Sequence, residues 1–114
     1  MHTASAIAFG ENGHFANTLE VKDANNDPTG FFSGSTLWDS DLDIYAQINQ
    51  NGPLLGSHID MIHQSPYSVG IAWERDNVYW LFDGYHSAIC KYDFANPHSF
   101  GGDNHADGLV YRYS

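Results

Sequence analysis

The stretch from Tyr67 to Phe94, YSVGIAWERDNVYWLFDGYHSAICKYDF, contains three short apolar segments separated by two turn sequences. Aromatic and β-branched residues dominate the apolar segments, which is typical of β-strands. The turns fall at residues 75–77, Arg-Asp-Asn, and at residues 83–84, Asp-Gly, both of which suit tight hairpins. The stretch therefore predicts an antiparallel sheet. Its expected strands are Ile71–Glu74, Val78–Phe82 and Ala88–Phe94.

The rest of the chain shows the same alternation of short apolar runs with turns rich in Gly, Asn and Asp. One segment suits a helical turn instead: Ser57–Gln64, with Ser57 as N-cap, Asp60 at the third helical position and Pro66 ending it. The 114 residues and the 15% aromatic content predict one all-β domain, residues 1–114. Further strands are expected at Ser5–Phe9, Phe15–Val21, Phe31–Leu37, Leu42–Ile48 and Leu109–Tyr113.

The chain is strongly acidic, with a net charge of −10 and only four basic residues. This balance disfavours nucleic acid and anionic membrane surfaces, because few cations are available to pair with phosphate. A metal cation, a basic protein surface or a small neutral ligand suits it better. No apolar run approaches the roughly 18 residues of a membrane span, and the first residues do not form a signal peptide, so we expect a soluble, cytoplasmic protein. The single cysteine, Cys90, excludes an intrachain disulfide and is expected to be buried.

The segment SVGIAWERDNVYWLFDGYHSAICKYDF resembles an NHL-type repeat, the blade unit of one large group of six-bladed β-propellers. Gly70-Ile-Ala resembles the opening of the repeat and Asn77-Val-Tyr its second strand, although the spacing from Pro66 is two residues longer than usual. Asp83-Gly-Tyr-His stands where the family often has Asp-x-x-Asn-His, and Ile89–Asp93 matches the third strand. A fainter similarity between the segments starting at residues 34 and 70 suggests two blade-like units, at about residues 30–50 and 66–114.

This resemblance implies a fold that is incomplete as a monomer, because a blade buries its faces only against neighbouring blades. About two blades in each chain favour a homo-oligomer, with a trimer closing a ring of six. The alternative is a small, self-contained β-sandwich or barrel. The family includes binding platforms, structural domains and a few metal-dependent lyases and lactonases, so fold alone does not select a function.

The most suggestive polar cluster is GGDNHADG at residues 101–108. Asp103, His105 and Asp107 alternate, so in an extended segment all three would project to one side and bind a divalent metal ion, calcium or zinc. Asp23, Asn25 and Asp27 also alternate, but their segment fits a plain turn better than a calcium loop. A third group, His58, Asp60 and His63, would need His86 or His105 from elsewhere to complete a mixed site.

Three aromatic residues next to turns, Trp38, Tyr67 and Tyr85, are candidates for binding a neutral ligand such as a sugar. Acid–base candidates are Asp60, His63, Glu74 and Asp83, yet the chain carries no nucleophile elbow, phosphate-binding loop or zinc-protease motif, so no catalytic residue is assigned. The leading expectation is a non-enzymatic binding or scaffold protein. The alternative is a metal-dependent hydrolase or lyase. Its site would draw on Asp60, His63, His86, Asp103, His105 and Asp107.

Overall fold

The computed structural model describes residues 4–25, 27–45, 58–99, 102, 104–105 and 107–114. Strands make up almost all of the regular structure in these residues, which confirms the all-β prediction. The helix α1 is too short to cross a membrane, and no other helix occurs in the described residues. The elements are β1 (Ala4–Phe9), β2 (His14–Leu19), β3 (Ser35–Asp39), α1 (Leu42–Tyr45), β4 (Asp60–Ile62), β5 (Ser68–Arg75), β6 (Val78–Asp83), β7 (Ala88–Asp93) and β8 (Leu109–Tyr113).

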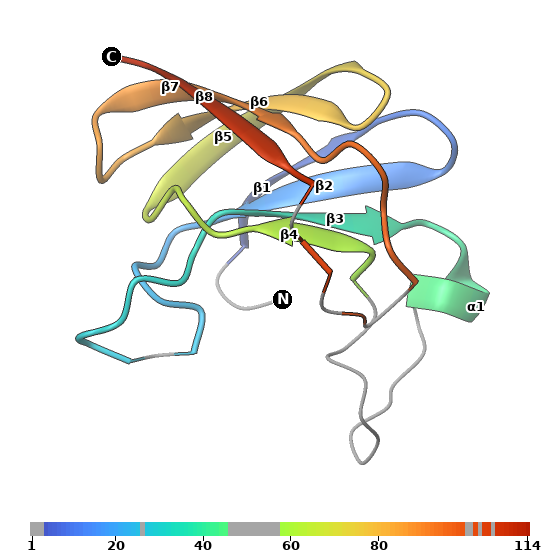
Figure 1. Cartoon of the computed structure of the whole chain (residues 1–114), viewed down its shortest axis with the longest axis horizontal. Helices are drawn as coiled ribbons and strands as arrows, with labels where there is room; N and C mark the ends of the chain where they lie inside the picture. Colours follow the sequence, from blue (N-terminus) through green and yellow to red (C-terminus); the bar gives the residue numbers. More distant parts are fainter. Residues whose placement is uncertain (1–3, 26, 46–57, 100–101, 103, 106) are drawn as a thin grey trace.

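The strands form two antiparallel sheets, each a meander of four consecutive strands (Figure 1). The first sheet has the order β1-β2-β3-β4 and the second the order β5-β6-β7-β8. The three strands expected within residues 67–94 all form, and the expected strand Leu109–Tyr113 joins them as the fourth. This arrangement is compatible both with blade-like sheets and with a β-sandwich.

Two apolar faces meet between the sheets and make the core. The first sheet contributes Ala16, Leu37 and Ile62, and β5 packs against β1 and β2. The core residues of the second sheet and its flanking segment are Tyr79, Leu81, Ala88, Cys90, Tyr92 and Phe94. The burial expected for Cys90 is confirmed.

A β-bulge in β5 decides which of its side chains face the core. The pairing with β6 shifts between Val69 and Ile71, and the intervening Gly70 has a φ of 63°, a left-handed conformation that glycine adopts without strain. Because the bulge adds one residue, Ile71 packs against the core while Val69 faces outward. Without it, residues 69 and 71 would project to the same face.

The expected strand Leu42–Ile48 is wrong over its first four residues, which form α1; residues 46–48 lie outside the described part of the chain. Asp41 caps the helix, because its side chain accepts a hydrogen bond from the N–H of Asp43 at 2.9 Å and its carbonyl accepts one from the N–H of Tyr45 at 2.7 Å. Tyr45 in turn packs against Phe15 and Trp38. Local capping and this aromatic contact therefore outweigh the alternating pattern.

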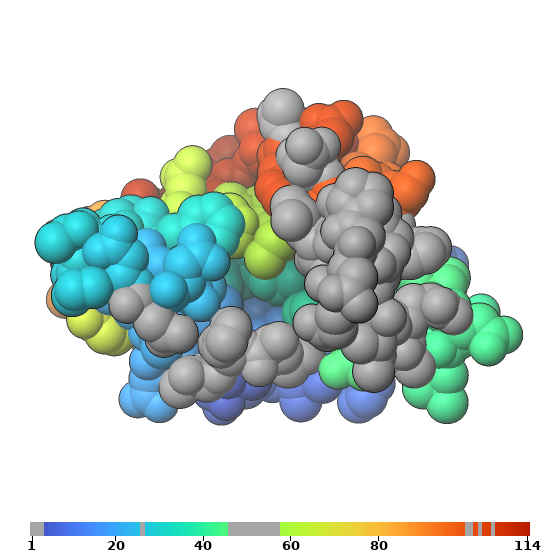
Figure 2. Space-filling model, turned by 90° about the horizontal axis from the view of Figure 1, so that it is seen from below, coloured from blue at the N-terminus to red at the C-terminus, as the bar shows by residue number. Residues whose placement is uncertain are grey.

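The expected helical turn at Ser57–Gln64 is also wrong, since Asp60–Ile62 is strand β4; Ser57 lies outside the described residues. This segment pairs with β3, placing Asp60 opposite Leu37 and Ile62 opposite Ser35. Pairing with a sheet edge and burial of Ile62 favour the strand over a weakly capped turn. The strand expected from Phe31 begins later, at Ser35, and Figure 2 shows the preceding segment at the opposite end of the molecule from α1.

Candidate metal centre

Three histidine side chains converge at one place in the described part of the chain. His58 lies just before β4, and His98 and His105 lie in the connection between β7 and β8. One candidate ligand atom from each of them lies within 4.8 Å of the other two. The ring centroids are 5.0 Å apart for His58 and His98, 5.4 Å for His58 and His105, and 5.0 Å for His98 and His105. These three residues are called the histidine cluster below.

Backbone hydrogen bonds position the histidine cluster by joining the two sheets. The N–H of Ile59 donates to Leu37 O at 2.9 Å, which holds the segment carrying His58 on the first sheet. The N–H of His98 donates to Ile59 O at 2.8 Å, which brings the β7–β8 connection to the same segment. Figure 1 shows this connection running from the second sheet to the neighbourhood of β4 before it returns to β8. The cluster therefore depends on the contact between the sheets.

The spacing of the cluster suits a tetrahedral metal ion. Zinc–imidazole bonds of about 2.0–2.1 Å place two nitrogens of a tetrahedron about 3.3–3.4 Å apart. The Nε2 atoms of His58 and His105 are 3.3 Å apart. The remaining separations, up to 4.8 Å, need only small rotations of the side chains to reach the same value.

Hydrogen bonds set the tautomers of two cluster members. His98 Nδ1 lies 2.6 Å from the carbonyl oxygen of Ser99, which only accepts, so the hydrogen is on Nδ1 and Nε2 carries a lone pair. That Nε2 is buried and has no hydrogen-bond partner among the described residues. His58, 2% exposed, places Nε2 at 2.9 Å from Gly102 O and therefore donates from it. Coordination through this atom requires His58 to move its hydrogen to Nδ1, whereas His98 is ready to bind a metal as it stands.

A fourth histidine, His63, lies beside the cluster. Its ring stacks on Phe32 with centroids 3.6 Å apart, and its centroid is 6.0 Å from that of His105. Both of its ring nitrogens are buried without a hydrogen-bond partner in the described residues. Burial lowers the pKa of His63 to about 4, helped by repulsion from His105 and His58, so its ring is neutral at pH 7.

Asp60 is the second group in this region whose pKa is shifted. Its Oδ1 accepts a hydrogen bond from the N–H of Met61 at 2.8 Å, while its Oδ2 is buried without a partner among the described residues. Burial, helped by the negative charge of Asp107, raises the pKa of Asp60 to about 7. Asp60 is not one of the residues whose ligand atoms converge.

Within its described part, the structure does not bring together the residues expected to bind metal. His105 belongs to the histidine cluster, whereas Asp107 is exposed and accepts a hydrogen bond from the N–H of Asn96 at 3.0 Å. Asp103 lies outside the described residues. His105 was expected, as an alternative to His86, to join the group of His58, Asp60 and His63 in a mixed site. Of that group only His58 converges with His105, and His98 was missed. The signal for it was its place in the same turn-rich, histidine-containing loop, residues 95–108.

His86 takes part in a separate structural contact. The buried carboxylate of Asp83 accepts hydrogen bonds from His86 N–H at 2.9 Å and His86 Nδ1 at 2.7 Å, and Arg112 lies 3.4 Å away. Burial opposes ionisation of Asp83, but the hydrogen bonds from His86, with another from Ser65, outweigh it and lower the pKa of this carboxyl. Asp83 therefore stabilises its own turn by accepting hydrogen bonds from it.

The three aromatic candidates lie in different surroundings. Trp38 contacts Phe15 and donates from Nε1 to Asn17 Oδ1, and its ring centroid is 6.5 Å from that of His58. Tyr67 and Tyr85 are exposed at the other sheet, where the N–H of Tyr85 donates to the carbonyl of Pro66, the residue before Tyr67. The Tyr85 ring contacts Phe31 and His86 with centroids 5.1 and 5.0 Å apart. Trp38 is therefore a packing residue next to the histidine cluster, while Tyr67 and Tyr85 remain candidates for ligand contact.

Comparison with models of protein families, with curated proteins and with solved structures finds no match for this chain. The NHL-type resemblance of residues 66–94 therefore stays a prediction, and the function rests on the geometry described above.

Proposed function

We propose that this protein binds one divalent transition-metal ion through His58, His98 and His105, with zinc as the ion that suits the site best. The observation that carries this proposal is the convergence of three imidazoles from both sheets, two of them at the 3.3 Å spacing of a tetrahedral site. The buried, unpartnered Nε2 of His98 supports it, because a buried lone pair without a partner is costly unless a cation or donor meets it.

Calcium is the less favourable of the two expected ions. It takes six to eight oxygen ligands, whereas the converging groups in the described residues are all imidazoles. Imidazole suits zinc, copper and nickel, and zinc needs no redox partner or special geometry.

Among the described residues the three histidine ligands leave one tetrahedral position open for a further ligand. That arrangement is typical of catalytic zinc, whereas structural zinc is closed by four protein ligands. It supports the metal-dependent hydrolase or lyase as the function class, with the metal as the electrophile.

Metal stoichiometry tests the proposal directly. Purified full-length chain is stripped with chelator, supplied with zinc, passed through a desalting column and analysed by native mass spectrometry. We expect one zinc per chain in the wild type and a loss of at least tenfold in affinity in His98→Ala and His105→Ala. His14→Gln is the matched control, because His14 pairs with Asn77 in a different part of the structure. Wild-type chain that retains no zinc, or alanine variants that bind it as well as the wild type, would refute the metal site.

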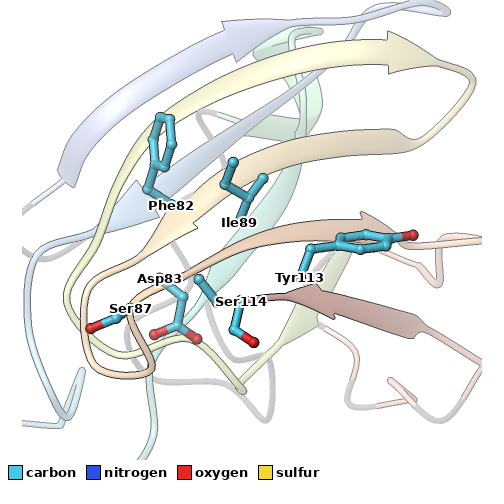
Figure 3. A pocket seen from close by; sticks show the side chains of 7 residues that line it. Phe82, Asp83, Ser87, Ile89, Tyr113 and Ser114 are labelled. Atoms are coloured by element: carbon cyan, nitrogen blue, oxygen red, sulfur yellow. The ribbon is translucent and has the colours of Figure 1, made fainter.

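A second candidate function, a non-enzymatic scaffold of blade-like sheets in a homo-oligomer, is favoured by the outer face of the second sheet. One cross-strand row on this face, Val69, Phe82, Ile89 and Tyr113, spans all four strands, and each of its side chains is 40–55% exposed. Figure 3 shows Phe82 and Ile89 projecting to the same side of the sheet. Both residues, with Tyr113, line a shallow hollow of about 350 Å³. Sheet faces of this kind are normally covered.

The partner we propose for this face is the first sheet of another copy. Together with Tyr111, the row exposes roughly 500 Å², if about half of the 150–250 Å² of each large side chain is exposed. A standard interface buries about 800 Å² on each partner. The neighbouring cross-strand row is Ala72, Trp80, Lys91 and Tyr111. Its one basic side chain, Lys91, is already paired with Glu74 at 3.2 Å, so the face is close to neutral. The first sheet exposes Ile7 and Phe9 on the side away from the core, which would supply the complementary surface.

Oligomeric state in solution tests this second candidate. Light scattering after size-exclusion chromatography is expected to show a closed oligomer, with three copies for a ring of six sheets. This oligomer should dissociate in the variant Phe82→Ser. Phe82 lies on the outer face, so the core should be unaffected. A wild-type monomer at a concentration of about 100 μM would refute blade sharing, since the Kd values of stable standard-size interfaces lie well below this concentration.

A further inference from the structure

His63 is the unassigned polar group nearest to the histidine cluster. Its two ring nitrogens are buried, and neither has a hydrogen-bond partner among the described residues. The ring cannot turn freely, because it stacks on Phe32. Buried polar groups without partners are rare in folded proteins, and each calls for a ligand, an ordered water or another explanation.

His63 stands slightly outside the set of direct ligands. Its centroid is 6.0 Å from His105, against 5.0–5.4 Å within the histidine cluster, and it is not among the residues whose ligand atoms converge. A side chain at this position reaches a molecule bound to the metal more readily than it reaches the metal itself. The neutral imidazole offers that molecule one N–H donor.

The charge of the proposed centre decides what kind of molecule this is. Three neutral imidazoles leave both positive charges of a divalent ion uncompensated. In the described residues no carboxylate joins the converging group, and Asp107 is exposed and directed to Asn96. The chain's negative surface charge is screened over about 8 Å at physiological salt, so it does not cancel this local attraction. An anion with oxygen donors is therefore the favoured fourth ligand.

We infer that the metal centre takes a carboxylate-type oxygen anion as its fourth ligand, and that His63 donates a hydrogen bond to the anion's second oxygen. This inference rests on the proposed metal site. It makes His63 a positioning residue for the bound anion and names carboxylates as the ligand class.

Cobalt substitution provides the test, because tetrahedral Co²⁺ absorbs visible light and the spectrum changes when its fourth ligand changes. The full-length chain is loaded with Co²⁺ and titrated with acetate. The variants are His63→Ala, His63→Gln, which restores an N–H donor, and Gln64→Ala as a control at the exposed neighbouring position. We expect acetate to alter the wild-type spectrum, His63→Ala to weaken acetate binding about tenfold with unchanged cobalt affinity, and His63→Gln to recover part of the loss.

The outcomes separate the two proposals. Failure of the wild type to bind cobalt would overturn the metal site and this inference with it. Cobalt bound without any response to acetate would overturn the carboxylate ligand while leaving the metal site intact. Equal acetate affinity in His63→Ala would remove His63 from the anion's contacts. A loss of cobalt affinity in His63→Ala, with an altered spectrum before acetate is added, would identify His63 as a direct ligand and contradict its proposed role.

Discussion

The buried carboxyl of Asp60 should contribute stability that falls as the pH rises from about 4 to 7. Because the lowered pKa of His63 acts in the opposite direction over the same range, the contribution of Asp60 is measured as the difference between the wild type and an Asp60 variant. The pKa of Asp60 is raised from 3.8 to about 7 in the folded state, chiefly by burial, so the folded chain holds a proton in this range that the unfolded chain has released. Because the folded state binds more protons at this carboxyl, its contribution to the free energy of unfolding falls as the pH increases. The contribution is fully present below pH 4 and is lost by about pH 7.

The magnitude follows from the same pKa values. A change from 3.8 to about 7 corresponds to roughly 4 kcal/mol at 1.36 kcal/mol per pH unit, which is an upper value for a single carboxyl. Asp60→Asn keeps the size of the side chain and removes its charge. Oδ2 already has no partner among the described residues in the wild type, so the amide that replaces it adds no new unpartnered atom. We therefore expect the variant to be more stable than the wild type at pH 8, by up to about 4 kcal/mol, and close to it in stability at pH 4.

Urea unfolding followed by tryptophan fluorescence at pH 4, 6 and 8, in chelator to exclude metal, measures this effect. Asp107→Asn is the control, because it removes the neighbouring charge from an exposed position and should shift the pH dependence only slightly. A wild type and an Asp60→Asn variant with parallel pH profiles would refute the reasoning, because Asp60 would then titrate alike in the folded and unfolded chains.

Two further predictions concern stability. Zinc at a hundredfold excess over its Kd should raise the free energy of unfolding by about 2.7 kcal/mol, which calorimetry would show as a higher melting temperature. This gain in stability should vanish in His98→Ala. An equal gain in that variant would show that zinc binds elsewhere. Tyr92→Phe should lower the free energy of unfolding by about 1–2 kcal/mol, because the Tyr92 hydroxyl donates to Ser65 Oγ at 2.7 Å in the core. An unchanged urea midpoint in Tyr92→Phe would mean that this hydrogen bond contributes nothing net.

The histidine cluster was predictable only in part. The sequence identified His105 as a metal candidate and as one of two residues, with His86, that could join the group of His58, Asp60 and His63, because imidazole is a common metal ligand. It missed His98, which is 40 residues from His58 and seven from His105. The missing information is the hydrogen bond between His98 N–H and Ile59 O, a contact between distant segments that no local pattern encodes.

The sequence by itself determined the all-β class and the strands β5 to β8, because period-two apolar alternation and the Asp-Gly and Asp-Asn turns act over a few residues. Tertiary structure decided the rest. Leu42–Tyr45 alternates like a strand but is a capped helix that packs on Phe15 and Trp38. Asp60–Ile62 has a helical cap pattern but pairs with β3. In both segments the local preference is small compared with the free energy of packing or pairing against a distant strand. The same contact between sheets brings His58, His98 and His105 together, so the site exists only in the folded chain.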